Sequence, residues 1–423
     1  MQDSRLRSRL KAQLTKFTLE LGQSLSRPHQ KFVGQMLFGI QASQDVKLSS
    51  IARSLQEQIP LIKTEDRLSR NLKAKQLETE LTAQLAQMAS LRIQANTVLC
   101  LDLSDVRKEY AKKMEHLAVV RDGSTGEMHA GYWLCDITAA EVNGSEIVPV
   151  YQKLYSAEAQ DFESENAEVL AGVDLVREHT QGRGIWAVDR GGDRKKLLEP
   201  LLDRQERFVI RSTGKRFVVN RRHLKWSVVE LGARCRLRHR ARIIKIQDGQ
   251  EKTYELRYGV EPIRLVGRQE QLHLVVVSGF GEEPLLLLTN VLGRARDSQS
   301  LWWIVQIYLM RWKIEETFRF IKQSYNLEDI RVMKYQRLKN LVVLVTAAAY
   351  FAATFLGQKM KLRILCEKLL IISQRFFGIP PFRFYALADG IKNVLTRTSP
   401  DPWAQPPPSQ QLRLVFGWEG QRI

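Results

Sequence analysis

Four chemically active side chains recur at helical spacing in the C-terminal half of the chain. They are Tyr308, Arg311, Glu315 and Lys322. At about 100° per residue these positions fall within roughly 60° of one another on a helix, whereas Glu316 lies on the other side of that stripe. A carboxylate can bind a metal ion, an arginine can fork onto a phosphate, a lysine can neutralise it and a tyrosine can donate to it. The spacing therefore predicts a phosphate-handling face, with a solvated amphipathic helix as the plainer interpretation.

Two aspartates add carboxylates from elsewhere in the chain. Asp102 and Asp189 each follow a short apolar run that is typical of a buried strand. Open α/β sheets bind ligands at the carboxyl ends of their strands, so each aspartate is a candidate site residue. Asp105 and Asp193 are close competitors, and an aspartate in such a position often only starts a turn.

The elements that must position these groups change in character along the chain. Residues 1–90 have apolar side chains at helical spacing and predict an all-helical region. Residues 91–212 predict strands in hairpin order and then strands that alternate with helices, which indicates a mixed α/β sheet. Residues 213–297 predict a β-rich insertion, and residues 298–398 predict helices that begin with one long helix from Ser298 to about Asn326. Residues 399–423 are rich in proline and predict an irregular tail.

Within the helical region, one pair of segments is similar to a helix-turn-helix reader of DNA. We expect a short helix capped at Ser49 and Ser50, then Pro60, then a second helix that opens at Thr64. The second helix carries four cations: Arg67, Arg70, Lys73 and Lys75. The alternative is a plain helical bundle with a solvated basic face.

An arginine alternation stands out in the β-rich region. Its members are Arg234, Arg236, Arg238, Arg240 and Arg242. We predict a strand from Cys235 to Ile246; on a strand that also includes Arg234, all five would lie on one face about 6.7 Å apart, a spacing that can follow a DNA backbone. Arg221, Arg222 and Lys225 extend this basic region. The alternative is an edge strand kept charged against aggregation.

Composition favours a polyanionic partner and excludes several classes of protein. Lys and Arg number 65 against 46 Asp and Glu, a net charge of +19, which favours nucleic acid or an anionic surface. The four cysteines (Cys100, Cys135, Cys235 and Cys366) have no zinc-ligand spacing. The charged start predicts no signal peptide, and we expect a cytoplasmic protein. Residues 340–357 carry no charge, and we interpret them as a buried helix with a membrane contact as the alternative.

The Tyr308-x2-Arg311-x3-Glu315-x6-Lys322 pattern resembles, spacing for spacing, the Tyr-Arg-Glu-Lys signature of the insertion-sequence-four family of bacterial DDE transposases. The surrounding Arg311-Trp312-x-Ile314-Glu315 is similar to that family too. The order of Asp102, then Asp189 in an Asp-Arg-x-x-Asp context, then a β-rich insertion before the glutamate, also agrees. The resemblance covers roughly residues 90–360, and the N-terminal helices resemble the family's DNA-end-binding region only in general character.

The resemblance implies a metal-dependent enzyme of DNA recombination. It implies an RNase H-like core in which Asp102, Asp189 and Glu315 hold two Mg²⁺ or Mn²⁺ ions, the hard cations that carboxylates suit. It implies cleavage of phosphodiester bonds at transposon ends and transfer of the 3′-hydroxyl into target DNA. It also implies that Tyr308, Arg311 and Lys322 hold phosphates, and that a homodimer brings two double-stranded ends together.

Other roles stay open at the level of the sequence. Trp302, Trp303 and Trp312 could receive a flipped base, although packing is the more ordinary role of each. The alternatives to a transposase are an inactive, sequence-specific DNA-binding descendant, a nuclease that cuts without joining strands, and a peripheral membrane protein.

Overall fold

The computed structural model covers all 423 residues. It describes residues 2–108, 111–123, 125–142, 144, 146–247, 250–292, 297–366 and 384–396. The proline-rich tail predicted at residues 399–423 lies outside the described residues.

Helices form both ends of the described chain. The helices are α1 (Gln2–Leu21), α2 (Arg27–Ser43), α3 (Leu48–Leu55), α4 (Leu61–Asn71), α5 (Leu77–Ser90), α6 (Glu165–Thr180), α7 (Lys195–Asp203), α8 (Val228–Arg234), α9 (Ser298–Leu309), α10 (Trp312–Ser324), α11 (Tyr335–Tyr350), α12 (Gln358–Cys366) and α14 (Phe384–Thr396). Short helical turns are η1 (Arg190–Gly192), η2 (Leu327–Asp329) and η3 (Phe351–Phe355).

The strands lie between α5 and α9. They are β1 (Val98–Arg107), β2 (Ala118–Arg121), β3 (Met128–Ala140), β4 (Ile147–Tyr155), β5 (Ile185–Val188), β6 (Phe208–Arg211), β7 (Phe217–Asn220), β8 (Lys225–Ser227), β9 (His239–Gln247), β10 (Gln250–Leu265), β11 (Leu272–Ser278) and β12 (Leu285–Thr289).

One mixed sheet joins all of these strands, as the sequence predicted for residues 91–212. Its order is β2-β3-β1-β5-β6-β12-β11-β10-β7-β8, with β4 on β3 and β9 on β10. β5 runs parallel to β1 and to β6, and the other described pairs are antiparallel. Because β12 pairs with β6, the strands of residues 213–297 extend this same sheet.

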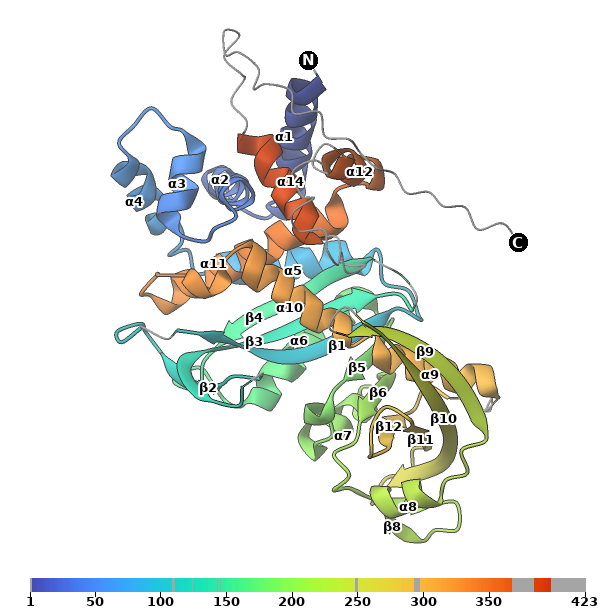
Figure 1. Cartoon of the computed structure of the whole chain (residues 1–423). Coiled ribbons are helices and arrows are strands. Elements are labelled where there is room, and N and C mark those ends of the chain that lie inside the picture. The colour runs from blue at the N-terminus through green and yellow to red at the C-terminus, as the bar shows by residue number, and fades with distance from the viewer. Residues whose placement is uncertain are drawn as a thin grey trace, which may run out of the picture.

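Helices cover both faces of the sheet where β3 and β4 lie. Neighbouring residues of a strand point to opposite faces. On β4, the ring of Tyr151 lies against Gly172 of α6, and Gln152 accepts a hydrogen bond from Thr346 of α11 at 2.6 Å. α11 and α6 therefore pack on opposite faces, as Figure 1 also shows. α10 lies on the α11 side and contacts β1 and β3.

A buried asparagine ties the N-terminal helices to α11. Asn340 is fully buried, and its Nδ2 donates to the carbonyls of Leu72 and Ala74 at 2.8 Å each. Its Oδ1 accepts from the Glu78 amide at 3.0 Å, so the asparagine satisfies backbone groups between α4 and α5. This contact fixes α4 and α5 relative to the helix that covers the sheet.

The uncharged segment of residues 340–357 forms the interior of the protein. Helical residues Tyr335–Phe355 have a mean hydropathy of 1.6 over an 18-residue window, and 89% of that window is buried inside the molecule. This is one helix that length and composition alone would allow to cross a membrane, among the residues described. Its burial against β4, α2 and α5 agrees with the interpretation as a core helix.

Several predicted boundaries are wrong for identifiable reasons. α4 begins at Leu61 after Pro60, not at Thr64, whose buried hydroxyl donates to Glu57 at 2.8 Å. Ser49 and Ser50 lie inside the first turn of α3, and the carboxylate of Asp45 accepts from Lys47 N and Ser50 Oγ near its start.

Two further segments were assigned to the wrong element. Residues 228–234, within the region predicted to be β-rich, form the helix α8, because Ser227 and Glu230 make a reciprocal capping box. The predicted long helix from Ser298 is also wrong, since it divides at Met310 and Arg311 into α9 and α10. The amides of Arg311, Lys313 and Ile314 bond three residues back at this break.

Candidate active site

The two parallel strands β1 and β5 bring Asp102 and Asp189 together. The last paired positions of these strands are Leu101 and Val188, and the two aspartates follow them at the same edge. β1 does not end at Asp102 as predicted, because it continues to Arg107 along β3. The pairing of β1 with β5 does stop at Leu101 and Val188, directly before the two aspartates.

The backbone after β5 turns sharply beneath Asp189. Its Oδ1 accepts from the Gly191 amide at 2.7 Å and so starts η1. A Cβ on Gly192 would lie 2.7 Å from Val188, so only glycine lets the turn fold back this closely. The aspartate is thereby held at the strand end by a hydrogen bond from the backbone that follows it.

Arg311 joins the other two groups of the predicted site. Its Nη1 lies 3.2 Å from Asp102 Oδ2, and its Nη2 lies 2.6 Å from Glu315 Oε1. Arg311 immediately precedes α10, and the four-residue offset to Glu315 places both side chains on one face, as predicted. The guanidinium therefore lies between a carboxylate of β1 and a carboxylate of α10.

The electrostatics of Asp102 show that the three carboxylates act on one another. The pKa of Asp102 is raised to about 7, chiefly by burial and then by the charges of Asp189 and Glu315, while Arg311 opposes the rise. Burial also disfavours the charge of Arg311, but Glu315 and Asp102 outweigh it and raise the pKa of the guanidinium above its usual value. A cation at this edge is thus electrostatically favoured.

These groups suit a hard divalent cation in their chemistry, although they do not form a complete shell. In the part of the chain that the structure describes, no three His, Cys, Asp or Glu side chains lie close enough to hold a metal ion as they stand. The donors are carboxylate oxygens, which Mg²⁺ and Mn²⁺ prefer, and their mutual repulsion on Asp102 is what such an ion relieves. The guanidinium supplies the positive charge between Asp102 and Glu315 in this arrangement.

A fourth carboxylate was missed by the sequence reasoning. Asp136 of β3 is the cross-strand partner of Asp102 and is buried. Its pKa is raised to about 7, chiefly by burial and also by the charge of Asp102, whereas the hydrogen bond that Gln152 Nε2 donates to it at 2.6 Å opposes the rise. An aspartate inside the apolar run Tyr132–Ile137 was the signal that could have found it.

The remaining members of the signature take different places. Tyr308 belongs to α9, is 7% exposed and lies close enough to Arg311 to influence it electrostatically. Lys322 lies 3.8 Å from Asp105 and 3.2 Å from Glu328, near the other end of α10. The break between α9 and α10 means that the four residues do not share one continuous helix face.

The competing aspartates have structural partners. Asp105 pairs with Lys322. The side chain of Asp193 is completely buried and accepts from Ser212 Oγ, the amide and hydroxyl of Thr213, and Arg216 Nε at 2.6–3.0 Å. Asp193 therefore fixes the loop after β6.

The tryptophans divide between packing and exposure. Trp302 packs with its ring centroid 5.8 Å from that of Tyr258, and Trp303 packs against the core. Trp312 is 41% exposed and follows Arg311 directly. Of the three candidates for stacking on a base, Trp312 has the exposed surface that this role requires.

The arginine alternation is not one strand face, contrary to the prediction. Arg234 ends α8 and lies 4.3 Å over the ring of Trp226. Arg236 and Arg238 precede β9, which begins at His239, so only Arg240 and Arg242 share a strand face. The carbonyl of Arg236 crosses Gly259 of β10, where a Cβ would lie 2.3 Å away. All five arginines are nevertheless exposed.

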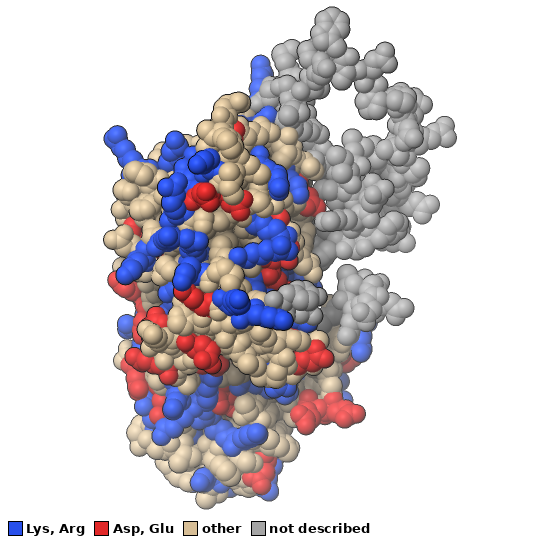
Figure 2. All heavy atoms as spheres, turned by 90° about the vertical axis from the view of Figure 1, so that its left-hand side faces the viewer, with Lys and Arg blue, Asp and Glu red and all other residues tan. Residues whose placement is uncertain are grey.

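The basic helix of the N-terminal region is partly neutralised. Arg67 pairs with Glu57 at 2.8 Å, and Arg70 is exposed. Lys73 and Lys75 are exposed too, but they follow the end of α4 at Asn71 and so do not lie on this helix, contrary to the prediction. Figure 2 looks onto the side of the molecule where α3 and α4 lie and shows many Lys and Arg side chains over that face, with carboxylates between them. Exposed cations thus gather on a face separate from the ribbon of β9 and β10.

Comparisons with known proteins identify no family for the chain. No protein-family model matches the sequence, and no curated protein matches it. Among solved structures, it is similar to a piggyBac transposase in a synaptic complex with hairpin DNA, at 11% sequence identity and a TM-score of 0.44. The similarity covers 93% of this chain and 84% of that chain. A similarity of this size does not define the function of this chain.

Proposed function

We propose that this protein is a DDE transposase of an insertion sequence, with an RNase H-like catalytic core. It cleaves phosphodiester bonds at transposon ends and transfers the 3′-hydroxyl into target DNA. The observation that carries the proposal is the meeting of Asp102, Asp189, Arg311 and Glu315 at one sheet edge from three distant segments. The Tyr308 to Lys322 spacing supports it from the sequence.

In this proposal Asp102, Asp189 and Glu315 hold two Mg²⁺ or Mn²⁺ ions. When bound, the ions supply an activated nucleophile and stabilise the leaving oxygen. Arg311 holds the carboxylates in register and presents donors to a phosphate, since its Nε is buried without a hydrogen-bond partner among the described residues. Trp312 offers an exposed ring beside it.

Double-stranded DNA is the substrate in this proposal, and its ends are brought together by a homodimer. The exposed cations of α4, of the segment Arg234–Arg238 and of β9 would bind its backbone. Lys322 would add charge from the end of α10, where Asp105 and Glu328 hold it.

The second candidate is a DNA-binding protein of transposase descent that no longer cuts. One observation favours it: the guanidinium of Arg311 already neutralises Asp102 and Glu315 in an internal ion-pair network. Such a network can be structural, since ion pairs also perturb pKa values outside active sites.

An excision assay separates the two candidates. The donor is a plasmid that carries the DNA flanking this gene, incubated with the wild-type protein in Mg²⁺ or in EDTA. We expect excision in Mg²⁺ only, and none from the Asp102→Asn variant. DNA binding without excision under every condition would favour the inactive descendant.

A further inference from the structure

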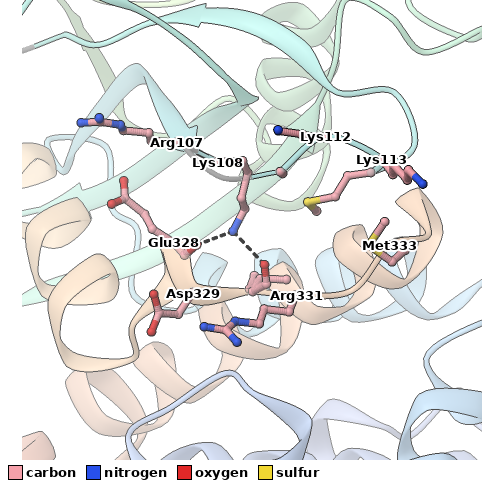
Figure 3. A pocket seen from close by; sticks show the side chains of 11 residues that line it. Arg107, Lys108, Lys112, Lys113, Glu328, Asp329, Arg331 and Met333 are labelled. Carbon is pink, nitrogen blue, oxygen red and sulfur yellow. Dashed lines mark hydrogen bonds between the residues drawn. The ribbon is translucent and has the colours of Figure 1, made fainter.

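Asp102, Asp189, Arg311 and Glu315 form what we call the carboxylate edge. A second feature lies beyond it, at the far end of β1. A cavity of about 770 Å³ opens between the residues that follow β1 and the connection from η2 to α11. We name it the β1-end cavity and define it by Arg107, Lys108, Lys112, Lys113 and Arg331 on its walls. Figure 3 shows the first four on one side and Arg331 across from them.

Positive charge dominates the lining of this cavity. The five cations face two carboxylates, Glu328 and Asp329. Both carboxylates already have partners outside the lining, since Lys322 lies 3.2 Å from Glu328 and Lys47 pairs with Asp329. The cavity is therefore left with excess positive charge.

Three of the cations are available to a ligand. Lys112, Lys113 and Arg331 are exposed. Among the described residues, none of the three has a carboxylate within 4 Å. Exposed like charges around one hollow repel one another unless an anion is bound.

Lys108 adds a buried cation that points into the same place. It is 5% exposed, and its Nζ donates to the carbonyls of Glu328 at 2.6 Å and Ile330 at 3.1 Å, as Figure 3 shows. An ammonium group has three donors, so one remains for a ligand. Burial lowers the pKa of Lys108 to about 8, while Glu328 and Asp329 act in the opposite direction. An anion in the cavity would restore the charge that burial disfavours.

The cavity stands in a defined relation to the carboxylate edge. Arg107 lies five positions after Asp102 on β1, which corresponds to a path of about 17 Å along the strand. Eleven helical residues separate Arg311 from Lys322, a path of about 16 Å, and Lys322 contacts Glu328 of the lining. Both paths equal about five nucleotide steps of one DNA strand.

We propose that the β1-end cavity binds the phosphodiester backbone of DNA about five nucleotides from the bond that is cut beside Asp102. This rests on the proposed function. Among the described residues, the lining has no aromatic ring for a base to stack on, and its apolar members are aliphatic, such as Ala111, Met114 and Met333. Contacts to phosphates position a protein on DNA, and the cations of the described lining suit that role.

A binding experiment on the full chain tests this proposal without relying on cleavage. The variant Lys112→Ala/Lys113→Ala/Arg331→Ala removes the three exposed cations and leaves Lys108 in place. The control variant Arg5→Ala/Arg9→Ala/Lys16→Ala removes three exposed cations from α1. Affinity for labelled duplex DNA is measured by fluorescence anisotropy over a series of salt concentrations, and melting temperatures confirm that each variant folds.

We expect the slope of log K against log [salt] to become shallower by about 0.9 for each phosphate that is no longer neutralised, up to ~2.7 in the cavity variant. The wild type should bind more weakly to a duplex that carries one uncharged methylphosphonate about five nucleotides from the cut than to the unmodified duplex. The cavity variant should bind both duplexes with equal affinity. Unchanged slopes, or equal sensitivity of both proteins to the methylphosphonate, would overturn the proposal.

Two DNA substrates show whether the cavity binds the transposon end or DNA of any sequence. One duplex carries the end sequence that flanks this gene, and the other is an unrelated duplex. A loss of affinity confined to the end duplex assigns the cavity to the transposon end, and an equal loss on both assigns it to DNA of any sequence, including the target. If the chain binds DNA through this cavity but never cuts it, the proposed function fails while the cavity assignment stands.

Discussion

The carboxylate edge and the ribbon of β9 and β10 treat charge in opposite ways. At the edge, Arg311 lies between Asp102 and Glu315, so a cation of the molecule itself offsets part of the negative charge of the carboxylates. On the ribbon, Arg240 lies directly opposite Arg257, and both are exposed. Like charges in such a pair destabilise a sheet unless an outside anion compensates them.

In the proposed function, the carboxylate edge carries out the chemistry and the ribbon binds DNA. Opposed charges around a buried carboxylate set up a place where a cation and a phosphate can replace internal partners. Exposed cations that face one another bind a polyanion and release it as the salt concentration rises. Variants in the two regions should therefore fail in different assays.

The largest effect is expected at Asp189. The Asp189→Asn variant should lower the rate of DNA cleavage by about 10³-fold, or ~4 kcal/mol in the barrier, because a metal ligand is removed. Its melting temperature should stay near that of the wild type. Asp203→Asn at the end of α7 is the control, and a normal cleavage rate in Asp189→Asn would remove Asp189 from the site.

The neighbouring aspartate should show the reverse behaviour. Asp193→Ala leaves Arg216 and the Thr213 amide without their buried carboxylate, so we expect a loss of about 3 kcal/mol in the free energy of unfolding. Urea denaturation measures it. A stable Asp193→Ala protein that no longer cleaves DNA would mean that the two aspartates have been assigned the wrong way round.

Arg311→Ala should have an intermediate effect that depends on the metal. Without the guanidinium, Asp102 and Glu315 lack their shared partner, and we expect a loss of about 1–3 kcal/mol in stability in EDTA. Mg²⁺ should recover part of this loss by supplying the missing charge. Thermal melts with and without Mg²⁺ measure it, and a loss of stability that Mg²⁺ does not change would favour a purely structural network.

The ribbon should give the smallest effect. Arg240→Ala/Arg257→Ala removes opposed cations, so the melting temperature should stay equal or rise slightly. The salt dependence of DNA binding should become shallower by about 0.9 for each phosphate that these arginines neutralise in the wild type. Arg268→Ala is the control because the carboxylates of Asp203 and Glu270 already pair with its guanidinium. An equal change in salt dependence in Arg268→Ala would mean that Arg240 and Arg257 have no special role in DNA binding.

The parts of the site that follow from local geometry could be predicted from the sequence. Arg311 and Glu315 are four residues apart at the start of a helix, and that offset fixes their contact. Asp102 and Asp189 follow apolar runs that are typical of buried strands, and because these two strands pair in parallel, their ends lie together.

The parts that depend on packing between distant segments could not be predicted. The break at Met310 and Arg311 has neither glycine nor proline to signal it. The alternation expected of a strand is hard to see in β4 because Pro149 interrupts it, and the structure places that proline opposite Thr138 at a shift in register. The arginine alternation misled because residues 234–242 cross a helix end, an irregular segment and a strand, which no period of two can reveal.

The most direct test of the carboxylate edge is cleavage by the Glu315→Gln variant. An end-labelled duplex with the sequence that flanks this gene is incubated in Mg²⁺ with the wild type, Glu315→Gln or Glu316→Gln, and binding is followed in parallel. If Glu315 holds the metal ions, the wild type and Glu316→Gln cleave the duplex, whereas Glu315→Gln binds it without cleaving it. Cleavage by Glu315→Gln at the wild-type rate would contradict it.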